Sequence, residues 1–245
     1  EKCMRYSISF LIIFLSFVFA DCNDQFACNF NDSGPCDYSC HDNGDYSLSF
    51  DGNDDTVHVD HIDFSIDNFA VKIIFNSNEY SGSNTQTLFR QDQCESGTNV
   101  YIGLEGDGLN FGLTTPNYDG TGFNYDELGI AIDFSILEEN DGWNELLCTY
   151  DGDTKNVFLN GILMGSSTGN VGSGNIGLVS DCSEGKITIG SNEAGSYFDG
   201  SIDNISISNN FDFSTFIADY KFNASTGDTL YDHSGNQNHG TIYGA

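Results

Sequence analysis

Short alternating segments separated by glycine turns run through most of the chain, and they restrict its fold more than any other feature. The segment NVFLNGILMGS (156–166) places apolar residues two apart on both sides of Asn160-Gly161. An Asn-Gly pair supplies the two positive φ angles that a two-residue type I′ hairpin requires. We therefore expect a β-hairpin here, with one face of both strands buried.

The other strand-like segments are equally short. The chain has only two prolines but 28 glycines, as expected for many short strands joined by glycine turns. No segment has a sustained helical period, and no fixed-period repeat supports a propeller. The pattern predicts an all-β chain built as an antiparallel sandwich or barrel. The expected further strands are 46–50, 57–59, 69–75, 100–104, 109–113, 128–134, 143–150, 186–190, 198–208 and 217–222.

The stretch FDGSIDNISIS (198–208) breaks its own alternation. Apolar residues keep one phase as far as Ile202 and the opposite phase from Ile205, with Asp203 and Asn204 between them. A β-bulge inserts one extra residue into a strand and re-aims its side chains. We predict a bulge at Asp203-Asn204 that lets Ile202 and Ile205 both face the core. Asp203 would then face loose backbone amides or an ion.

The N-terminus is typical of a secretory signal peptide. An apolar run from Ile8 to Phe19 follows Arg5, and Ala20 is small enough for the cleavage position. The run is too short to span a bilayer, so we expect an extracellular protein, secreted or cell-surface, without membrane insertion after the signal is removed. The chain stops abruptly at GTIYGA, so we expect a truncated C-terminus. We also expect other domains of a longer chain as partners. The expected parts are a signal peptide (1–20), a cysteine-rich segment (21–43) and one β domain (44–245).

Secretion makes disulfides the expected state of most of the eight cysteines. Four of them crowd into the cysteine-rich segment and should form two disulfides in one of three connectivities, with a zinc site as the weaker alternative. Cys94 and Cys182 both lie in loop-like surroundings, so we pair them. Cys148 lies inside LLCTY, where we expect a buried free thiol. The four clustered residues are Cys22, Cys28, Cys36 and Cys40.

The charge is strongly acidic, with 37 Asp and Glu against seven Lys and Arg and a formal net charge of -30. Such a field repels phosphate backbones and anionic membranes, which excludes nucleic acid and lipid headgroups as expected partners. Hydrophobic residues make up 38% of the chain, enough for a real core. Most of the acids are therefore expected to be a solvated surface.

Four phrases together resemble the laminin-G-like, concanavalin A-like jelly-roll family in its bacterial or environmental secreted form. This resemblance covers about residues 44 to 245. The preceding segment, residues 21–40, resembles a short cysteine module of secreted marine bacterial proteins. The resemblance implies two antiparallel sheets packed face to face, one of them concave, and a structural role in the core for Trp143. It also implies adhesion or carbohydrate binding, sometimes with calcium. The phrases are YSLSFDGNDDTVHVD, WNELLCTYDGDTKNVFLNGILMG, FDGSIDNISISN and ADYKFNASTGDTLYDHSGNQNHGTIYGA.

Two acidic clusters are candidate calcium ligands, because hard cations take several oxygen ligands from loops. Asp51 and Asp54 belong to FDGNDDT, and Asp199 and Asp203 flank the expected bulge. The resemblance places the first and late strands close together, so the clusters should meet. The alternative, which we favour, is a plain turn at Asp51 and a capped bulge at Asp203. A third cluster, YDHSGNQNHG, predicts a loop stabilised by its own side chains.

Aromatic residues in polar loops are candidate contacts for a glycan or a cell-surface protein. Each one alone could equally cover the edge of the core. The candidate ligand-binding residues are Tyr80, Tyr118, Phe123, Tyr125 and Tyr197.

The sequence lacks the carboxylate pattern that a glycoside hydrolase of this fold would carry. The E-x-D-x-x-E pattern of laminarinase-type hydrolases does not occur. We therefore expect a non-catalytic binding module for carbohydrates or cell-surface adhesion. Two alternatives stay open, a structural spacer in a multidomain surface protein and a degenerate glycoside hydrolase.

Overall fold

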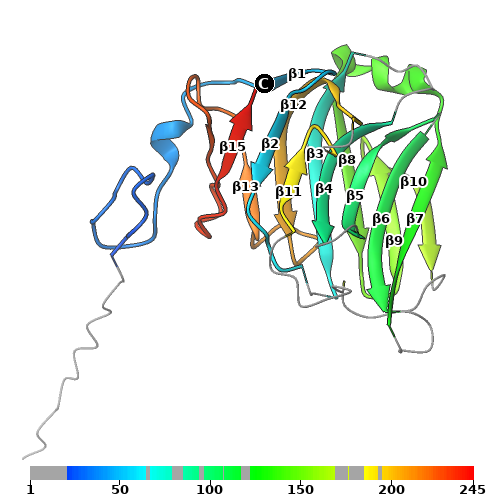
Figure 1. Ribbon diagram of the computed structural model, residues 1–245, viewed down its shortest axis with the longest axis horizontal. Helices are drawn as coiled ribbons and strands as arrows, with labels where there is room; N and C mark the ends of the chain where they lie inside the picture. Colours follow the sequence, from blue (N-terminus) through cyan, green and yellow to red (C-terminus); the bar gives the residue numbers. More distant parts are fainter. Residues whose placement is uncertain are drawn as a thin grey trace, which may run out of the picture.

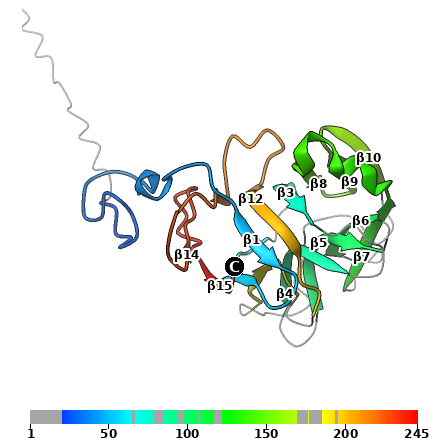
Figure 2. The same cartoon turned by 90° about the horizontal axis from the view of Figure 1, so that it is seen from above.

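The computed structural model describes residues 21–64, 67–78, 85–93, 97–106, 108–116, 122–168, 176, 185–192 and 195–245. Two antiparallel sheets pack face to face (Figure 1) and appear as two layers when the molecule is seen from above (Figure 2). The predicted all-β, two-sheet jelly-roll sandwich is confirmed. No helix in the described ranges is long and apolar enough to cross a membrane.

The first sheet has the order β1-β12-β3-β8-β9-β10, and β13 pairs with β12 beside β1. All of its pairs are antiparallel. Its strands are β1 (Leu48–Asp51), β3 (Phe69–Ser77), β8 (Asn144–Tyr150), β9 (Thr154–Leu159), β10 (Ile162–Thr168), β12 (Asp199–Ser208) and β13 (Ala218–Tyr220).

The second sheet has the order β14-β15-β2-β11-β4-β5-β6-β7. Three short 3-10 turns, η1 (Ser39–His41), η2 (Phe134–Glu138) and η3 (Asn140–Gly142), complete the described elements. The strands of this sheet are β2 (Thr56–Val59), β4 (Gln86–Gln93), β5 (Gly97–Glu105), β6 (Gly108–Pro116), β7 (Phe123–Ala131), β11 (Ile187–Ile189), β14 (Thr229–Leu230) and β15 (Gly240–Tyr243).

The core lies between the sheets and is built from the inward positions of each alternating strand. In β3 these are Phe69, Val71, Ile73 and Phe75, all fully buried. Burial of each such side chain contributes about 1.5–3 kcal/mol, so these inward faces hold the two layers together. Cys148 is buried in this core as a free thiol, as predicted, and burial raises the pKa of its thiol.

The predicted hairpin is confirmed at β9–β10. Asn160 and Gly161 have φ angles of 51° and 77°, and Leu159 pairs with Ile162 across the turn. The expected burial is only half right, because β10 is the last strand of its sheet. Val157 and Leu159 are buried, whereas Ile162 is 59% exposed.

The predicted bulge in β12 is also confirmed. The register against β3 shifts between Ile202, which pairs with Phe75, and Asn204, which pairs with Ile74. Ile202 and Ile205 are both fully buried, so the extra residue Asp203 restores the inward phase. The bulge falls where β12 changes partner on its other edge, from β1 to β13.

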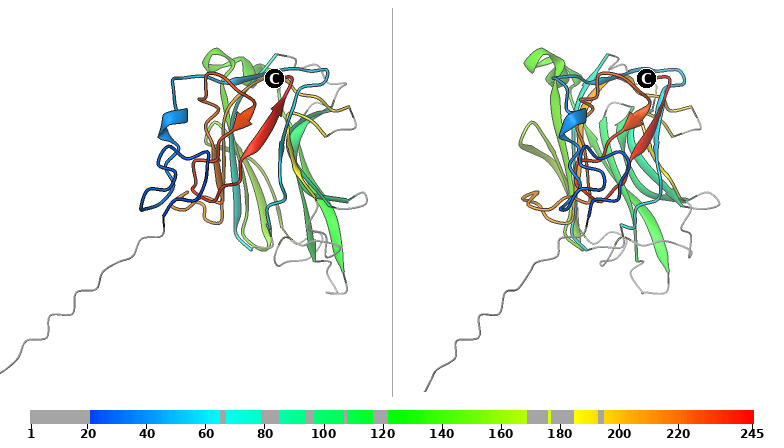
Figure 3. Two further views of the ribbon diagram at one scale, coloured as in Figure 1. Left: turned by 60° about the vertical axis from the view of Figure 1, so that its left-hand side comes forward. Right: turned by 90° about the vertical axis from the view of Figure 1, so that its left-hand side faces the viewer.

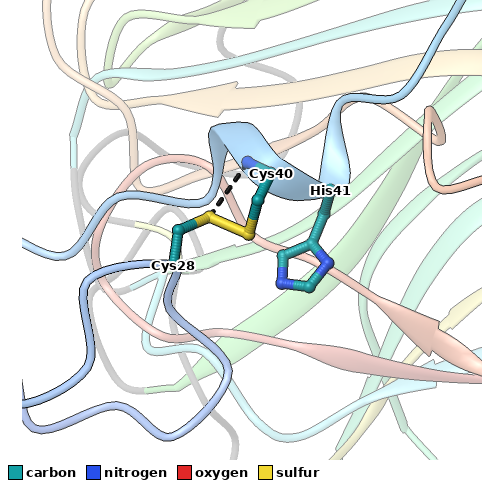
Figure 4. Close-up of side chains that lie close together, drawn as sticks. All are labelled: Cys28, Cys40 and His41. Atoms are coloured by element: carbon teal, nitrogen blue, oxygen red, sulfur yellow. Dashed lines mark hydrogen bonds between the residues drawn. A yellow bond between two sulfur atoms is a disulfide. The ribbon is translucent and has the colours of Figure 1, made fainter.

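The cysteine-rich segment contains two disulfides, Cys22–Cys36 and Cys28–Cys40. These bonds select one of the three predicted connectivities. Cys28, Cys40 and His41 lie within metal-binding distance of one another, but the two sulfur atoms are bonded to each other (Figure 4). A thiolate zinc site is therefore excluded here. The expected Cys94–Cys182 pair lies outside the described residues.

The cysteine-rich segment packs against the C-terminal part of the chain, as two views show (Figure 3). His41 stacks on Tyr231 with ring centroids 3.6 Å apart. Asp24 accepts hydrogen bonds from Tyr38 at 2.5 Å and from His239 at 2.6 Å. The segment is therefore joined to the sandwich by buried polar contacts.

The loop YDHSGNQNHG is stabilised by its own side chains, as predicted. The fully buried Asp232 accepts hydrogen bonds from the backbone amides of Asp219, Ser234 and Asn238 at 2.9 to 3.0 Å. The Ser234 hydroxyl donates a further bond at 2.8 Å. Because these donors already use both carboxylate oxygens, Asp232 shapes the loop and holds it against β13.

Candidate functional site

The outward face of the second sheet carries a row of polar residues at one level. Arg90 of β4 pairs with Tyr101 of β5, Tyr101 with Gly112 of β6, and Gly112 with Glu127 of β7. Side chains alternate between the two faces of a strand. Since Val100 and Ile102 are fully buried between the sheets, Tyr101 points away from the core.

A hollow of about 240 Å³ opens over this row. We call it the tyrosine hollow. Strands β4, β5 and β7 supply most of its walls, so residues far apart in sequence meet there. Its lining residues are Thr85, Arg90, Thr98, Tyr101, Glu105, Tyr125, Glu127 and Asn192.

Two glycines make room for the two tyrosines. A Cβ atom on Gly112 would lie 2.0 Å from the hydroxyl of Tyr125, and one on Gly103 would lie 2.5 Å from the hydroxyl of Tyr101. Only glycine permits such close approach of a side chain to the backbone. The glycines thus let both hydroxyls sit low in the floor of the hollow.

The hydroxyl of Tyr101 is buried and forms no hydrogen bond of good geometry with a described residue, although the Thr87 hydroxyl lies close enough to lower its pKa. The side chain is only 5% exposed. Burial, followed by the nearby charges of Glu105 and Glu127, raises the pKa of this phenol well above its ordinary value. The group therefore stays protonated and is free to donate a hydrogen bond into the hollow.

Tyr125 is held by Glu127, two residues along the same strand. Its hydroxyl donates to Oε1 of Glu127 at 2.8 Å, and the residue is 40% exposed. Burial of the hydroxyl, followed by the contact with Glu127, raises the pKa of Tyr125. The exposed ring is available for stacking against a ligand.

The remaining charged groups of the hollow are partly paired. Nε of Arg90 donates to the Asp92 carboxylate, and Glu105 accepts a hydrogen bond from Asn110 at 2.8 Å. The charge of Arg90 is therefore balanced by that of Asp92, while Glu105 and Glu127 add negative charge to the hollow.

The tyrosine hollow contains one of the five residues predicted to bind ligand. Tyr125 lines it, while Phe123 is exposed on the same strand outside the lining. Tyr197 is half-buried between β11 and β12 and does not belong to the lining of the hollow. Tyr80 and Tyr118 lie outside the described residues. Sequence reasoning missed Tyr101, because VYIGL resembles an apolar strand.

The predicted calcium ligands divide into two places. Carboxylate oxygens of Asp51, Asp54 and Asp55 lie within 4.8 Å of one another, and Asp199 is the cross-strand partner of Asp51. Burial, followed by the charges of Asp51 and Asp54, raises the pKa of Asp55. Asp203 lies four residues farther along β12 and does not join this cluster.

Asp203 instead lines a second hollow of about 410 Å³ on the outer side of the first sheet. No described donor forms a hydrogen bond with its carboxylate, so the expected cap by backbone amides is not formed. Burial, followed by the charge of Asp45, raises the pKa of Asp203. The lining of this Asp203 hollow is Asp45, Tyr46, Ser47, Ile74, Trp143 and Asp203.

Trp143 corrects a further expectation. It is half-buried beside the Asp203 hollow and does not belong to the core between the sheets. The following residue, Asn144, is the one that turns inward, and its side chain donates to the carbonyls of Leu137 and Gly142 at 2.9 Å. The strand's inward phase therefore begins one residue after Trp143.

A family model described as the concanavalin A-like lectin/glucanases superfamily, of the laminin G type, matches residues 51–211. The chain belongs to this superfamily. Among curated proteins, no relative of the chain is found.

Solved structures share the superfamily fold at low identity. A Bacteroides ovatus protein described as a candidate carbohydrate-binding protein is 14% identical with a TM-score of 0.55, and the match covers 81% of this chain and 58% of that one. This chain thus spans little more than half the length of that protein. Mouse laminin alpha1 domains LG4-5 are 12% identical with a TM-score of 0.47, covering 66% of this chain and 42% of theirs.

Proposed function

We propose that this superfamily member is a secreted, non-catalytic module that binds glycans in the tyrosine hollow. The observation that carries the proposal is the unpartnered, buried hydroxyl of Tyr101 beside the exposed ring of Tyr125. Sugars offer apolar C–H faces for stacking and hydroxyls for hydrogen bonds. The hollow offers an aromatic face, a phenol donor and two carboxylate acceptors.

Two further parts of the proposal concern location and calcium. The disulfides Cys22–Cys36 and Cys28–Cys40 favour an oxidising, extracellular space. The close oxygens of Asp51, Asp54 and Asp55 favour an oxygen-preferring cation such as calcium. In this proposal calcium supports the loop after β1, remote in sequence from the strands that line the tyrosine hollow.

The spacer alternative receives less support. A spacer would bury its aromatic residues, but Tyr125 is 40% exposed in a hollow. The partner of this module is therefore proposed to be a glycan, presented free or on a cell surface.

A glycan array, run with the native chain in calcium and in chelator, tests the proposal. We expect binding to a defined set of glycans, retained by Tyr243→Ala and lost by Tyr125→Ala. Tyr243 is a matched control because it is 49% exposed on β15 of the same sheet, outside the hollow. Release of reducing ends from any bound polysaccharide would instead support the hydrolase alternative.

A further inference from the structure

The charges around the tyrosine hollow limit which sugars it can accept. Glu105 and Glu127 line the hollow, while the guanidinium of Arg90 is already paired with Asp92. A carboxylate or sulfate on a sugar is best held by an Arg fork, but Nε of the one Arg in this hollow is engaged. The site therefore offers acceptors to a ligand and little positive charge.

The whole chain adds to this local charge. Its formal net charge of -30 repels anionic polymers at long range, as it repels nucleic acid. A neutral sugar is not repelled, and its hydroxyls can donate to the two carboxylates. Charge-assisted hydrogen bonds of this kind are stronger than neutral ones.

Tyr101 supplies the complementary donor. The residue lines the hollow, is more than nine-tenths buried, and its hydroxyl forms no hydrogen bond of good geometry with a described residue. Leaving a buried hydroxyl without a hydrogen bond costs about 1–3 kcal/mol. A sugar hydroxyl or ring oxygen placed above it would remove that cost, because a phenol both donates and accepts.

We infer that the tyrosine hollow selects neutral glycans and rejects anionic ones, with Tyr101 and Glu127 as the residues that set this specificity. The inference rests on the proposed glycan-binding function and adds the substrate class. Glu127 has a double part in it, since it orients Tyr125 through the 2.8 Å hydrogen bond and carries the charge that repels anions.

Polysaccharide pairs that differ mainly in charge test the inference. Affinity electrophoresis would compare hydroxyethylcellulose with carboxymethylcellulose, and methyl-esterified pectin with de-esterified pectin. We expect retardation by at least one neutral member and at least tenfold weaker binding to its anionic counterpart. Because salt screens repulsion between exposed charges, the difference should narrow as ionic strength rises.

Two variants separate the hydrogen bond from the charge. Tyr101→Phe keeps the ring and should weaken neutral binding about fivefold, the value of one net hydrogen bond. Glu127→Gln should reduce the preference for neutral over anionic polymers about tenfold. Tyr243→Phe on β15 and Glu145→Gln on β8 are matched controls outside the hollow and should bind like the native chain.

The outcomes distinguish the two proposals. Equal or stronger binding to an anionic member, lost on Tyr125→Ala, overturns the neutral specificity but keeps glycan binding. No retardation by either member of any pair, together with a silent glycan array, overturns both. Equal losses of affinity for the neutral polymer in Tyr101→Phe and Tyr243→Phe would overturn the hydrogen-bonding role assigned to Tyr101.

Discussion

His239 donates a hydrogen bond from Nε2 to the carboxylate of Asp24 at 2.6 Å, and thereby joins the cysteine-rich segment to the residues before β15. The donor is fixed by the other ring nitrogen, because Nδ1 of His239 accepts the backbone amide of Asp232 at 3.0 Å. Burial alone would raise the pKa of Asp24, but its hydrogen bonds from His239 and Tyr38 hold it below the ordinary value.

Replacing Asp24 with Asn should lower the free energy of unfolding by about 1–3 kcal/mol, since buried donors lose their acceptor. The pKa of Asp24 is lower in the folded chain than its ordinary value of 3.8. The stabilisation of the folded chain by the Asp24 carboxylate is therefore present above pH 3.8 and is lost as the pH falls below this value. In urea unfolding between pH 2 and 7, the free energy of unfolding should fall less steeply with acid for the variant than for the native chain. The same pH dependence in both proteins would contradict this.

Breaking the Cys28–Cys40 disulfide should loosen the segment's attachment to the sandwich. Each bond closes a loop of 14 or 12 residues in sequence separation, which stabilises the folded state by about 3 kcal/mol. In a Cys28→Ser, Cys40→Ser double variant, hydrogen exchange should accelerate in β14 and β15 but stay unchanged in β6 and β7. Uniform acceleration in both sheets would contradict a local effect.

Asp203→Asn should stabilise the fold at neutral pH. Burial and the charge of Asp45 raise the pKa of Asp203, so its ionised form opposes folding. The destabilisation appears as pH rises through this raised pKa and is absent below the ordinary value of 3.8. Melting temperatures should therefore differ at pH 7 and converge near pH 3. If Asp203→Asn raises the melting temperature equally with calcium and with chelator, calcium does not bind at Asp203.

The bulge could be predicted from sequence because it is local. The phase change between Ile202 and Ile205 requires one extra residue wherever the strand lies, and the register bears this out. The tyrosine hollow could not be predicted in the same way. Tyr101 and Glu127 become neighbours only through the register of β5, β6 and β7, and no pattern in one strand contains that information.

Gly112→Ala should impair binding while the chain stays folded. The added Cβ would lie 2.0 Å from the Tyr125 hydroxyl, so the tyrosine must leave its position. Loss of glycine within a strand removes a cost of about 0.5–1 kcal/mol, which offsets part of the strain. An unchanged glycan affinity for Gly112→Ala would contradict the claim that Gly112 makes room for the Tyr125 hydroxyl.

The most direct test of the account is the affinity of the native chain, Tyr125→Ala and Tyr243→Ala for a glycan that binds the native chain, measured by isothermal titration calorimetry. The account predicts that Tyr243→Ala binds like the native chain, whereas Tyr125→Ala loses at least tenfold in affinity with an unchanged melting temperature. Equal affinity of all three proteins would contradict glycan binding in the tyrosine hollow.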